Sequence, residues 1–399
     1  MSEASINRER RRVLAGGVGV FAASSLGAFV HPAWAQAKPL PQYVAWKNAA
    51  SMIVHSPNTL ETRRAALAKD LITAEHDLYV RNNLTPPSDS IIANRDAWEV
   101  AFEGVGKPRT LKVADLKSMG KIDVTMVLQC SGNGRAYFPH KPSGTQWSVG
   151  AAGCVTWGGV PLKRVVAALG GVQAGMVYLT GTGGETIPAG IDPKSVMVER
   201  SVPLKALEDA MLAWEVNGNP ISLGHGGPLR LIVPGYTGVN NVKYVKRIAF
   251  TTEQTDARIQ AGRYRMVPLG GKANPSLPSV WEMSVKSWIN LPAPDAGSVP
   301  AGSVWIQGVA FGGSTAAKNV EVSIDGGRTW RTAYFVGPDL GRFAWRQFVL
   351  PVRLAPGTYM LASRATDANG NVQPEQRVEN ASGYNNTSWR DHAIQITVV

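Results

Sequence analysis

The sequence predicts an α+β fold class, in which a mixed α+β domain is followed by an all-β, immunoglobulin-like sandwich. The 399 residues exceed the roughly 150 of an average domain. Because 44% of them are hydrophobic and 18% are charged, the chain can bury a large core and is not expected to be disordered. Strand patterns alternate with helical patterns in the first part of the chain, whereas only strand patterns occur beyond about residue 280.

The first 35 residues have the composition of an export signal. Arginines at positions 8 and 10–12 precede an apolar or small stretch over 13–30, and Ala33-Trp34-Ala35 matches a cleavage site. A transmembrane anchor is the alternative, but glycine, alanine and serine make the stretch less apolar than a stable span of about 20 residues requires. The paired arginines in RRRVLAGG indicate a twin-arginine signal, which predicts export of the folded protein to the periplasm.

Residues 36–279 form the predicted catalytic domain, and residues 36–87 are expected to wrap around the rest of it. A helical pattern runs from Leu60 to Ile72. Strands are expected at 98–102, 124–128, 177–179, 229–233 and 245–250. Proline starts and glycine ends predict two helices, at 162–169 and at 204–215.

Residues 280–399 form the second predicted domain. Turn sequences such as Asp325-Gly326-Gly327 and Asn369-Gly370 separate its strands. The strands are expected at 303–311, 319–324, 329–336, 343–349, 357–366 and 393–399. About seven short strands in this length are typical of an immunoglobulin-like sandwich.

The net charge of +12 is scattered along the chain. No run of Lys and Arg follows residue 35, so a nucleic-acid partner is not expected. No later segment is apolar enough to predict a membrane span after removal of the signal.

The first candidate site is the segment VTMVLQCSGNGR, in which an apolar strand ends at Cys130 and a Gly/Asn turn leads to Arg135. A neighbouring guanidinium favours the thiolate, the form that attacks electrophiles and binds metals. From the residues alone three interpretations stay open: a disulfide with Cys154, a free structural thiol, and a catalytic or metal-binding thiol. No histidine stands at a zinc spacing from a cysteine, and no C-x-x-C-H motif predicts a covalently bound haem in this chain.

The second candidate site is the segment GHGGPLRLIVPGYTGVNNVK, residues 224–243. His225, Arg230 and Lys243 lie among glycines that allow a ligand to approach the backbone, as a phosphate cradle requires. A purely structural role for these side chains is the alternative. The P-loop spacing is absent.

Six motifs together resemble the sulfite oxidase family of molybdenum enzymes. They are LYVRNNL (78–84), LQCSGNGR (128–135), TWGGVPL (156–162), HGGPLRLIVPG (225–235), NNVKYV (240–245) and VSIDGGRTW (322–330), in the family's order and spacing over residues 78–399. CSGNGR followed by QWSVGAAGC is most similar to the bacterial exported sulfite dehydrogenases.

The resemblance implies a molybdenum–molybdopterin cofactor whose metal is bound by the Cys130 thiolate, with Cys154 as a packed structural thiol. Soft sulfur ligands suit such a site. Substrate arginines fall on Arg81 and Arg135, and the family's tyrosine aligns with Tyr264, with Tyr236 and Tyr244 as alternatives. The implied cofactor-binding residues are Tyr79, Val80, Arg81, Asn82, Asn83, Cys130, Thr182, His225, Arg230, Asn241, Val242 and Lys243.

Two positions depart from the family pattern. Asn83 stands where the family often has histidine, and Ser382 stands where a third substrate arginine is expected, with Arg390 eight residues later. The resemblance implies oxidation of sulfite to sulfate, with electrons passed to a separate c-type cytochrome, and a homodimer held by the sandwich. A sulfane-sulfur dehydrogenase or sulfoxide reductase on the same scaffold and a non-catalytic exported binding protein are the alternative functions.

Overall fold

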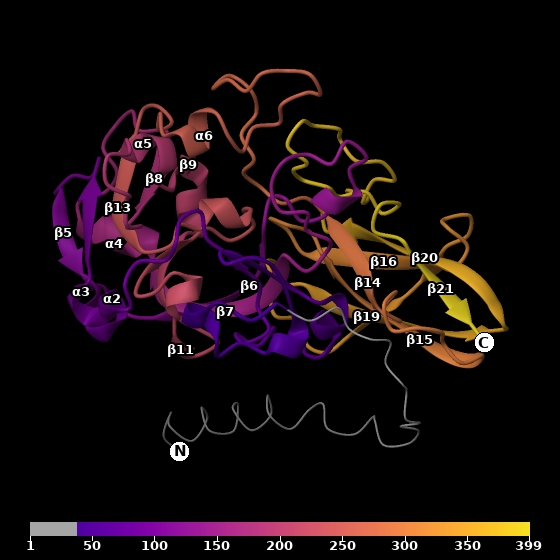
Figure 1. Ribbon diagram of the computed structural model, residues 1–399. Helices are drawn as coiled ribbons and strands as arrows, with labels where there is room; N and C mark the ends of the chain where they lie inside the picture. The colour runs from indigo at the N-terminus through magenta and orange to yellow at the C-terminus, as the bar shows by residue number, and fades with distance from the viewer. Residues whose placement is uncertain (1–37) are drawn as a thin grey trace, which may run out of the picture. The chain divides into compact units, whose positions relative to one another are not determined.

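The computed structural model describes residues 38–399, so the predicted export signal at 1–35 lies outside the described residues. Figure 1 follows this part of the chain from the short strands after residue 50 to the strand that ends at the C-terminus. None of the helices in the described range has both the length and the hydrophobicity that a membrane span needs.

A small antiparallel sheet precedes the main domain and consists of β1 (Met52–Ser56), β2 (Thr59–Thr62) and β3 (Val80–Arg81) in that order. The helix predicted over Leu60 to Ile72 is wrong, because Leu60 lies in β2 and a 3-10 helix, η3 (Arg64–Ala68), follows. All of β2 is buried and it pairs with strands on both sides, so its apolar residue Leu60 packs within the sheet rather than on a helix face.

The second sheet has the order β5-β4-β13-β8-β9, in which β13 and β4 are parallel and the other neighbours antiparallel. Its strands are β4 (Glu99–Glu103), β5 (Arg109–Lys112), β8 (Tyr178–Gly183), β9 (Glu199–Pro203) and β13 (Val245–Thr251). The accompanying helices are α2 (Ser90–Ala93), α3 (Val113–Ser118), α4 (Leu162–Ala168), α5 (Pro193–Val196) and α6 (Arg258–Ala261). The helix predicted at 162–169 is confirmed as α4.

The third sheet carries the candidate cysteine and has the order β11-β10-β7-β6, with β12 also paired to β10. Its strands are β6 (Ile122–Gln129), β7 (Ala152–Pro161), β10 (Met211–Val216), β11 (Asn219–Pro220) and β12 (Arg230–Ile232). The predicted helix at 204–215 is wrong: η6 (Leu204–Glu208) is a 3-10 helix, and the residues from Met211 form β10. Because β10 pairs with β7 and β12, both of its edges are occupied.

The C-terminal part consists of two four-stranded sheets, and the predicted β-sandwich is confirmed. One sheet has the order β14-β15-β19-β18 and the other β17-β16-β20-β21, and a shared cluster of buried aliphatic side chains joins them. The strands are β14 (Lys286–Leu291), β15 (Gly302–Phe311), β16 (Ala317–Ser323), β17 (Arg331–Thr332), β18 (Tyr334–Val336), β19 (Arg346–Leu354), β20 (Gly357–Asp367) and β21 (Ile394–Val398). The exact boundary near residue 280 stays a prediction.

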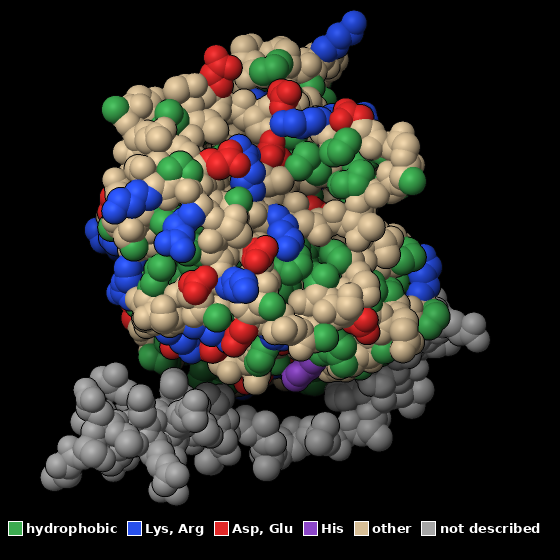
Figure 2. All heavy atoms as spheres, turned by 90° about the vertical axis from the view of Figure 1, so that its left-hand side faces the viewer, with side chains coloured by type: hydrophobic (Ala, Val, Ile, Leu, Met, Phe, Trp, Pro, Cys, Tyr) green, Lys and Arg blue, Asp and Glu red, His purple; other side chains and the backbone are tan. Residues whose placement is uncertain are grey.

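The charged side chains on the face drawn in Figure 2 are mixed in sign, with Lys and Arg beside Asp and Glu. The described part of the chain also contains ion pairs, for example Lys117 with Asp96 and Arg247 with Glu103. A large field of one sign, which a nucleic-acid surface would need, does not cover this face.

Candidate active site

Cys130 directly follows β6, the last strand in the order of the third sheet. The β6–β7 ladder runs to the pair Gln129 and Ala152, and the Cys130 amide adds one more bond to the Ala151 carbonyl, 2.9 Å away. The Asn133 amide then donates to the Cys130 carbonyl, which turns the chain away from the sheet. The thiol is therefore fixed by a strand on one side and a tight turn on the other.

The disulfide interpretation is wrong, because Cys130 and Cys154 are both free thiols. The strand register gives the physical reason: Cys154 is opposite Val127, three residues before Cys130. At about 3.3 Å per residue the two Cα atoms are roughly 10 Å apart, beyond the reach of a disulfide. Cys154 is fully buried, and burial raises the pKa of its thiol to about 12, as suits a packed structural residue.

Arg135 is held in one orientation by carbonyls from two parts of the chain. Its Nε donates to the Ser382 carbonyl at 2.9 Å and its Nη1 to the Thr145 carbonyl at 3.0 Å. The guanidinium also lies over the Tyr384 ring, 5.3 Å from its centre. A Cβ on Gly132 would lie 2.5 Å from Nη2, so the glycine of CSGNGR leaves room for the guanidinium.

The first cavity has an empty volume of about 730 Å³, which includes the open space at its mouth. Most of the predicted cofactor-binding residues line it: Tyr79, Arg81, Asn82, Asn83, Cys130, His225, Arg230, Asn241 and Lys243. Val80 and Val242 are buried and absent from its wall. Thr182 is absent as well, and its hydroxyl donates to the Glu199 carboxylate at 2.5 Å.

The wall of the first cavity is rich in buried cations. Arg230 donates to the carbonyls of Asn241 and His225, and burial lowers the pKa of its guanidinium to about 10. Lys243 donates to Asn82 Oδ1 at 2.7 Å and to the Gly224 carbonyl at 2.6 Å, and burial followed by the charge of Arg230 holds its pKa well below the usual value. Cations taken out of water favour an anionic partner.

Two further titratable side chains, His225 and Glu185, belong to this wall. His225 Nε2 is buried without a hydrogen-bond partner among the described residues, and burial followed by the charge of Lys47 lowers the pKa of this imidazole. Burial raises the pKa of Glu185 to about 7, while the charge of Lys243 acts in the opposite direction. The donors suit a ligand that carries both hydrogen-bonding groups and a phosphate, and molybdopterin is such a ligand.

The second cavity also has Cys130 in its wall and has an empty volume of about 1150 Å³. Arg81, Arg135 and Arg263 line it, together with Tyr264 and Tyr384. Arg81, Asn82, Asn83, Cys130 and Tyr264 line both cavities. The thiol thus lies where a cavity for an anionic cofactor meets a second cavity whose wall contains arginines.

Tyr264 is the tyrosine that the structure brings to this junction. Its ring stacks on Tyr384 with centroids 5.0 Å apart, and its backbone has φ of 51°, which is unfavourable for a bulky residue. Tyr236 donates to Glu282 outside both cavities, and Tyr244 lines the first cavity but donates to the Leu223 carbonyl. The geometry therefore favours Tyr264 over the two alternatives.

The position of the missing third arginine is also visible. Ser382 lines the second cavity, where its carbonyl holds Arg135. Arg390 is 60% exposed in its ion pair with Glu375, and it lines neither cavity. Sequence reasoning missed Arg263 and Tyr384 as cavity residues. Arg263 adjoins Tyr264 in the GRYR segment, which was a usable signal, whereas Tyr384 lies in a loop without a recognisable pattern.

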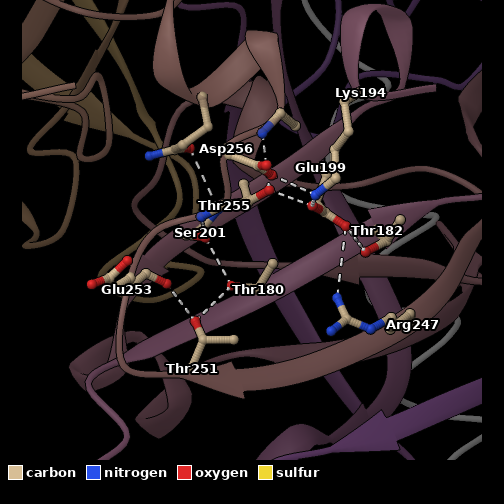
Figure 3. Close-up of polar contacts among 12 residues, drawn as sticks. Thr180, Thr182, Lys194, Glu199, Ser201, Arg247, Thr251, Glu253, Thr255 and Asp256 are labelled. Atoms are coloured by element: carbon tan, nitrogen blue, oxygen red, sulfur yellow. Dashed lines mark hydrogen bonds and ion pairs between the residues drawn. The ribbon is translucent and has the colours of Figure 1, made fainter. Parts of the chain in front are cut away.

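Thr182 belongs to a polar network around Glu199 (Figure 3), and neither residue lines the first cavity. Glu199 also accepts a hydrogen bond from Thr255 and pairs with Lys194 and Arg247. Burial alone would raise the pKa of Glu199, but hydrogen bonds from Thr182 and Thr255 contribute to a net lowering. Val198, which precedes Glu199 in the chain, lines the cavity, so the network anchors the backbone next to this part of the wall.

Comparisons with known proteins identify the family of the chain. A model of the oxidoreductase molybdopterin binding domain matches residues 86–259, and one of the Mo-co oxidoreductase dimerisation domain matches residues 278–398. Sulfite oxidase from Gallus gallus is 30% identical over 350 residues, covering 84% of this chain and 75% of the chicken protein. Mitochondrial sulfite oxidase from Homo sapiens is 30% identical over 364 residues, but the match covers only 64% of the human protein.

A solved structure shares the fold. The sulfane dehydrogenase SoxCD from Paracoccus pantotrophus matches with a TM-score of 0.72 and 24% identity, covering 95% of this chain and 96% of that chain. Fold and site together define an oxidoreductase that binds molybdopterin and carries a dimerisation domain. The chain belongs to the sulfite oxidase family, and its cofactor is molybdenum–molybdopterin.

Proposed function

We propose that the protein oxidises sulfite to sulfate and passes the electrons, one at a time, to a separate c-type cytochrome. The observation that carries the proposal is the junction at Cys130, where the cofactor cavity meets a second cavity with three arginines in its wall. Sulfite is a small oxyanion, and guanidinium groups bind such anions through charge-assisted hydrogen bonds. When bound, the molybdenum–molybdopterin centre supplies oxygen-atom transfer and accepts two electrons.

The side chains of this site divide the remaining work. Cys130 is proposed to ligate the metal, while His225, Arg230 and Lys243 hold the anionic part of the cofactor. Arg81 and Arg135 bind and orient the substrate oxygens. The Tyr264 phenol can hydrogen-bond the substrate and help to move the protons released in the net reaction, in which sulfite and water give sulfate, two protons and two electrons.

The proposal extends to location and assembly. The export signal predicted at residues 1–35 supports a periplasmic protein exported in its folded state, and the dimerisation domain at 278–398 supports a homodimer. A periplasmic location would also place the protein with soluble c-type cytochromes.

A sulfane-sulfur dehydrogenase is the second candidate, because the second cavity is larger than a sulfite ion needs. Its arginines and polar wall nevertheless favour a small oxyanion over a bulky apolar substrate. The test compares turnover of the molybdenum-loaded protein with sulfite, with thiosulfate as a sulfane donor, and with a sulfoxide in the presence of a reduced dye. The proposal expects fast turnover with sulfite; a preference for thiosulfate or the sulfoxide would overturn it.

A further inference from the structure

The wall of the second cavity is selectively basic. Arg81, Arg135 and Arg263 contribute to it, and no Asp or Glu of residues 38–399 does. A shortage of acidic residues does not explain this, because the chain has 29 of them against 41 basic residues. Charges of one sign that line a cavity add up to a stronger electrostatic potential inside it, since the surrounding protein screens them less than bulk water does.

The three arginines differ in the number of hydrogen bonds that their guanidinium groups already form with the protein. Arg135 is buried and donates to two backbone carbonyls, and Arg81 donates to the Asn82 carbonyl. Arg263 is exposed, and its guanidinium forms no hydrogen bond or ion pair within the described part of the chain. Of the three, Arg263 therefore has the most donors available to a ligand.

The local backbone fixes where Arg263 stands. On one side Tyr264 is held in a left-handed conformation by its stacking on Tyr384 and by the Val280 amide, which donates to its carbonyl at 2.8 Å. Next to it, Arg265 is buried and donates to the carbonyls of Gln260 and Leu277. Arg263 is thus an exposed side chain on an anchored backbone, which suits a binding position.

We propose that Arg263 forms an outer anion-binding site of the second cavity, which captures the substrate oxyanion before Arg81 and Arg135 bind it. The inference rests on the proposed function, in that it takes the substrate to be a small oxyanion. An exposed charge at a cavity speeds the approach of an opposite charge and depends strongly on ionic strength. Arg263 is accordingly a specificity-determining residue that acts on substrate capture more than on the chemical step.

Two measurements on the molybdenum-loaded holoenzyme test this proposal. The first is the KM for sulfite with a c-type cytochrome as acceptor, at about 20 mM and about 300 mM ionic strength. The second is the dissociation constant for sulfate by titration calorimetry, which needs no electron acceptor. Arg263→Gln removes the charge and Arg263→Lys keeps it.

Arg258→Gln is the matched control, because Arg258 is also exposed, lies five residues earlier on α6 and lines neither cavity. For Arg263→Gln we expect KM and the sulfate dissociation constant to rise about fivefold at low ionic strength, with a much smaller change in kcat. The difference from the native protein should shrink at high ionic strength, and Arg263→Lys should recover most of the loss. Arg258→Gln should match the native protein.

Equal effects of Arg263→Gln and Arg258→Gln on both measurements would overturn the proposal, as would a loss in kcat that does not depend on salt. The outcome is separable from that of the proposed function. If the native protein binds sulfate through Arg263 but does not oxidise sulfite, the proposed activity fails while the anion site stands. If sulfite is oxidised and Arg263 has no effect on either constant, the anion site fails alone.

Discussion

Cys130, the proposed metal ligand, and Arg135, a proposed substrate-binding residue, are five residues apart in the same loop. The strand end positions the thiol, and backbone carbonyls of Thr145 and Ser382 position the arginine. Both residue types were predictable from the CSGNGR motif, whereas the carbonyls that orient Arg135 come from distant loops with no sequence signal. For this loop, sequence therefore predicted the two residue types, and tertiary contacts determine how the side chains point.

Arg81→Gln tests the assigned substrate pocket. Gln keeps some donors but removes the charge, and each charge-assisted hydrogen bond contributes about 1.5–3 kcal/mol. We expect full molybdenum loading with kcat/KM for sulfite reduced at least about tenfold, and only partial recovery in Arg81→Lys, which lacks the planar fork. Unchanged kcat/KM at full metal loading would show that the anion binds elsewhere.

Lys286 gives a pH-dependent prediction. Its Nζ is buried and donates to Asn133 Oδ1 at 2.8 Å, and burial lowers the pKa of this ammonium to about 7, against about 10.4 in an unfolded chain. Between these values the unfolded state binds more protons, so the Lys286 contribution to stability rises with pH and is lost as the pH falls toward 7.

Lys286→Met removes this dependence from both states. From about pH 7 to about pH 9, the free energy of unfolding of the native protein should therefore rise relative to that of the variant, by up to about 1.4 kcal/mol per pH unit. Chemical denaturation across this range measures the difference. Lys163→Met, in an exposed ion pair with Glu208, is the control and should show no such trend. A native–variant difference independent of pH would contradict the prediction.

At the scale of secondary structure, tertiary pairing overrode two helical patterns. The apolar positions of 204–215 fit a helix face, yet Met211–Val216 pairs with strands at both edges. The strand β7 was not predicted, because its glycines weaken a strand pattern. Gly159 is required by its neighbour: a Cβ there would lie 2.1 Å from the Leu212 carbonyl oxygen. Such close approaches between strands far apart in sequence leave no local signal.

The Glu199 network joins β8, β9, β13 and the segment after β13 (Figure 3). Glu199→Gln should lower the free energy of unfolding by roughly 1–3 kcal/mol, because the neutral amide no longer forms ion pairs with Lys194 and Arg247. Glu103→Gln is the matched control: Glu103 also pairs with Arg247, but it is 50% exposed, so the loss should be about 1 kcal/mol or less. Differential scanning calorimetry compares the two variants, and equal losses would contradict a special role for the network.

At the scale of the whole molecule, the C-terminal part completes the site. Ser382 and Tyr384 line the second cavity, and Lys286 contacts the loop that follows Cys130. The predicted fold class, an α+β domain followed by a β-sandwich, is confirmed. The resemblance placed Ser382 at a substrate position, so one contribution of this half to the second cavity was expected, whereas nothing in the sequence indicated Tyr384. That contribution depends on loops of residues 380–388 that have no periodic pattern.

The oligomeric state is a property of the whole molecule. A dimerisation domain covers residues 278–398, and we expect a homodimer at micromolar concentration. Light scattering coupled to size-exclusion chromatography should give twice the mass of one chain. A monomer alone under these conditions would contradict the predicted homodimer.

The central claim is that Cys130 ligates molybdenum at the junction of the two cavities. X-ray absorption at the molybdenum edge tests it most directly, by comparing the native protein with Cys130→Ser. We predict that the variant has one sulfur neighbour fewer around the metal than the native protein. An unchanged number of sulfur neighbours in fully metal-loaded Cys130→Ser would contradict the assignment.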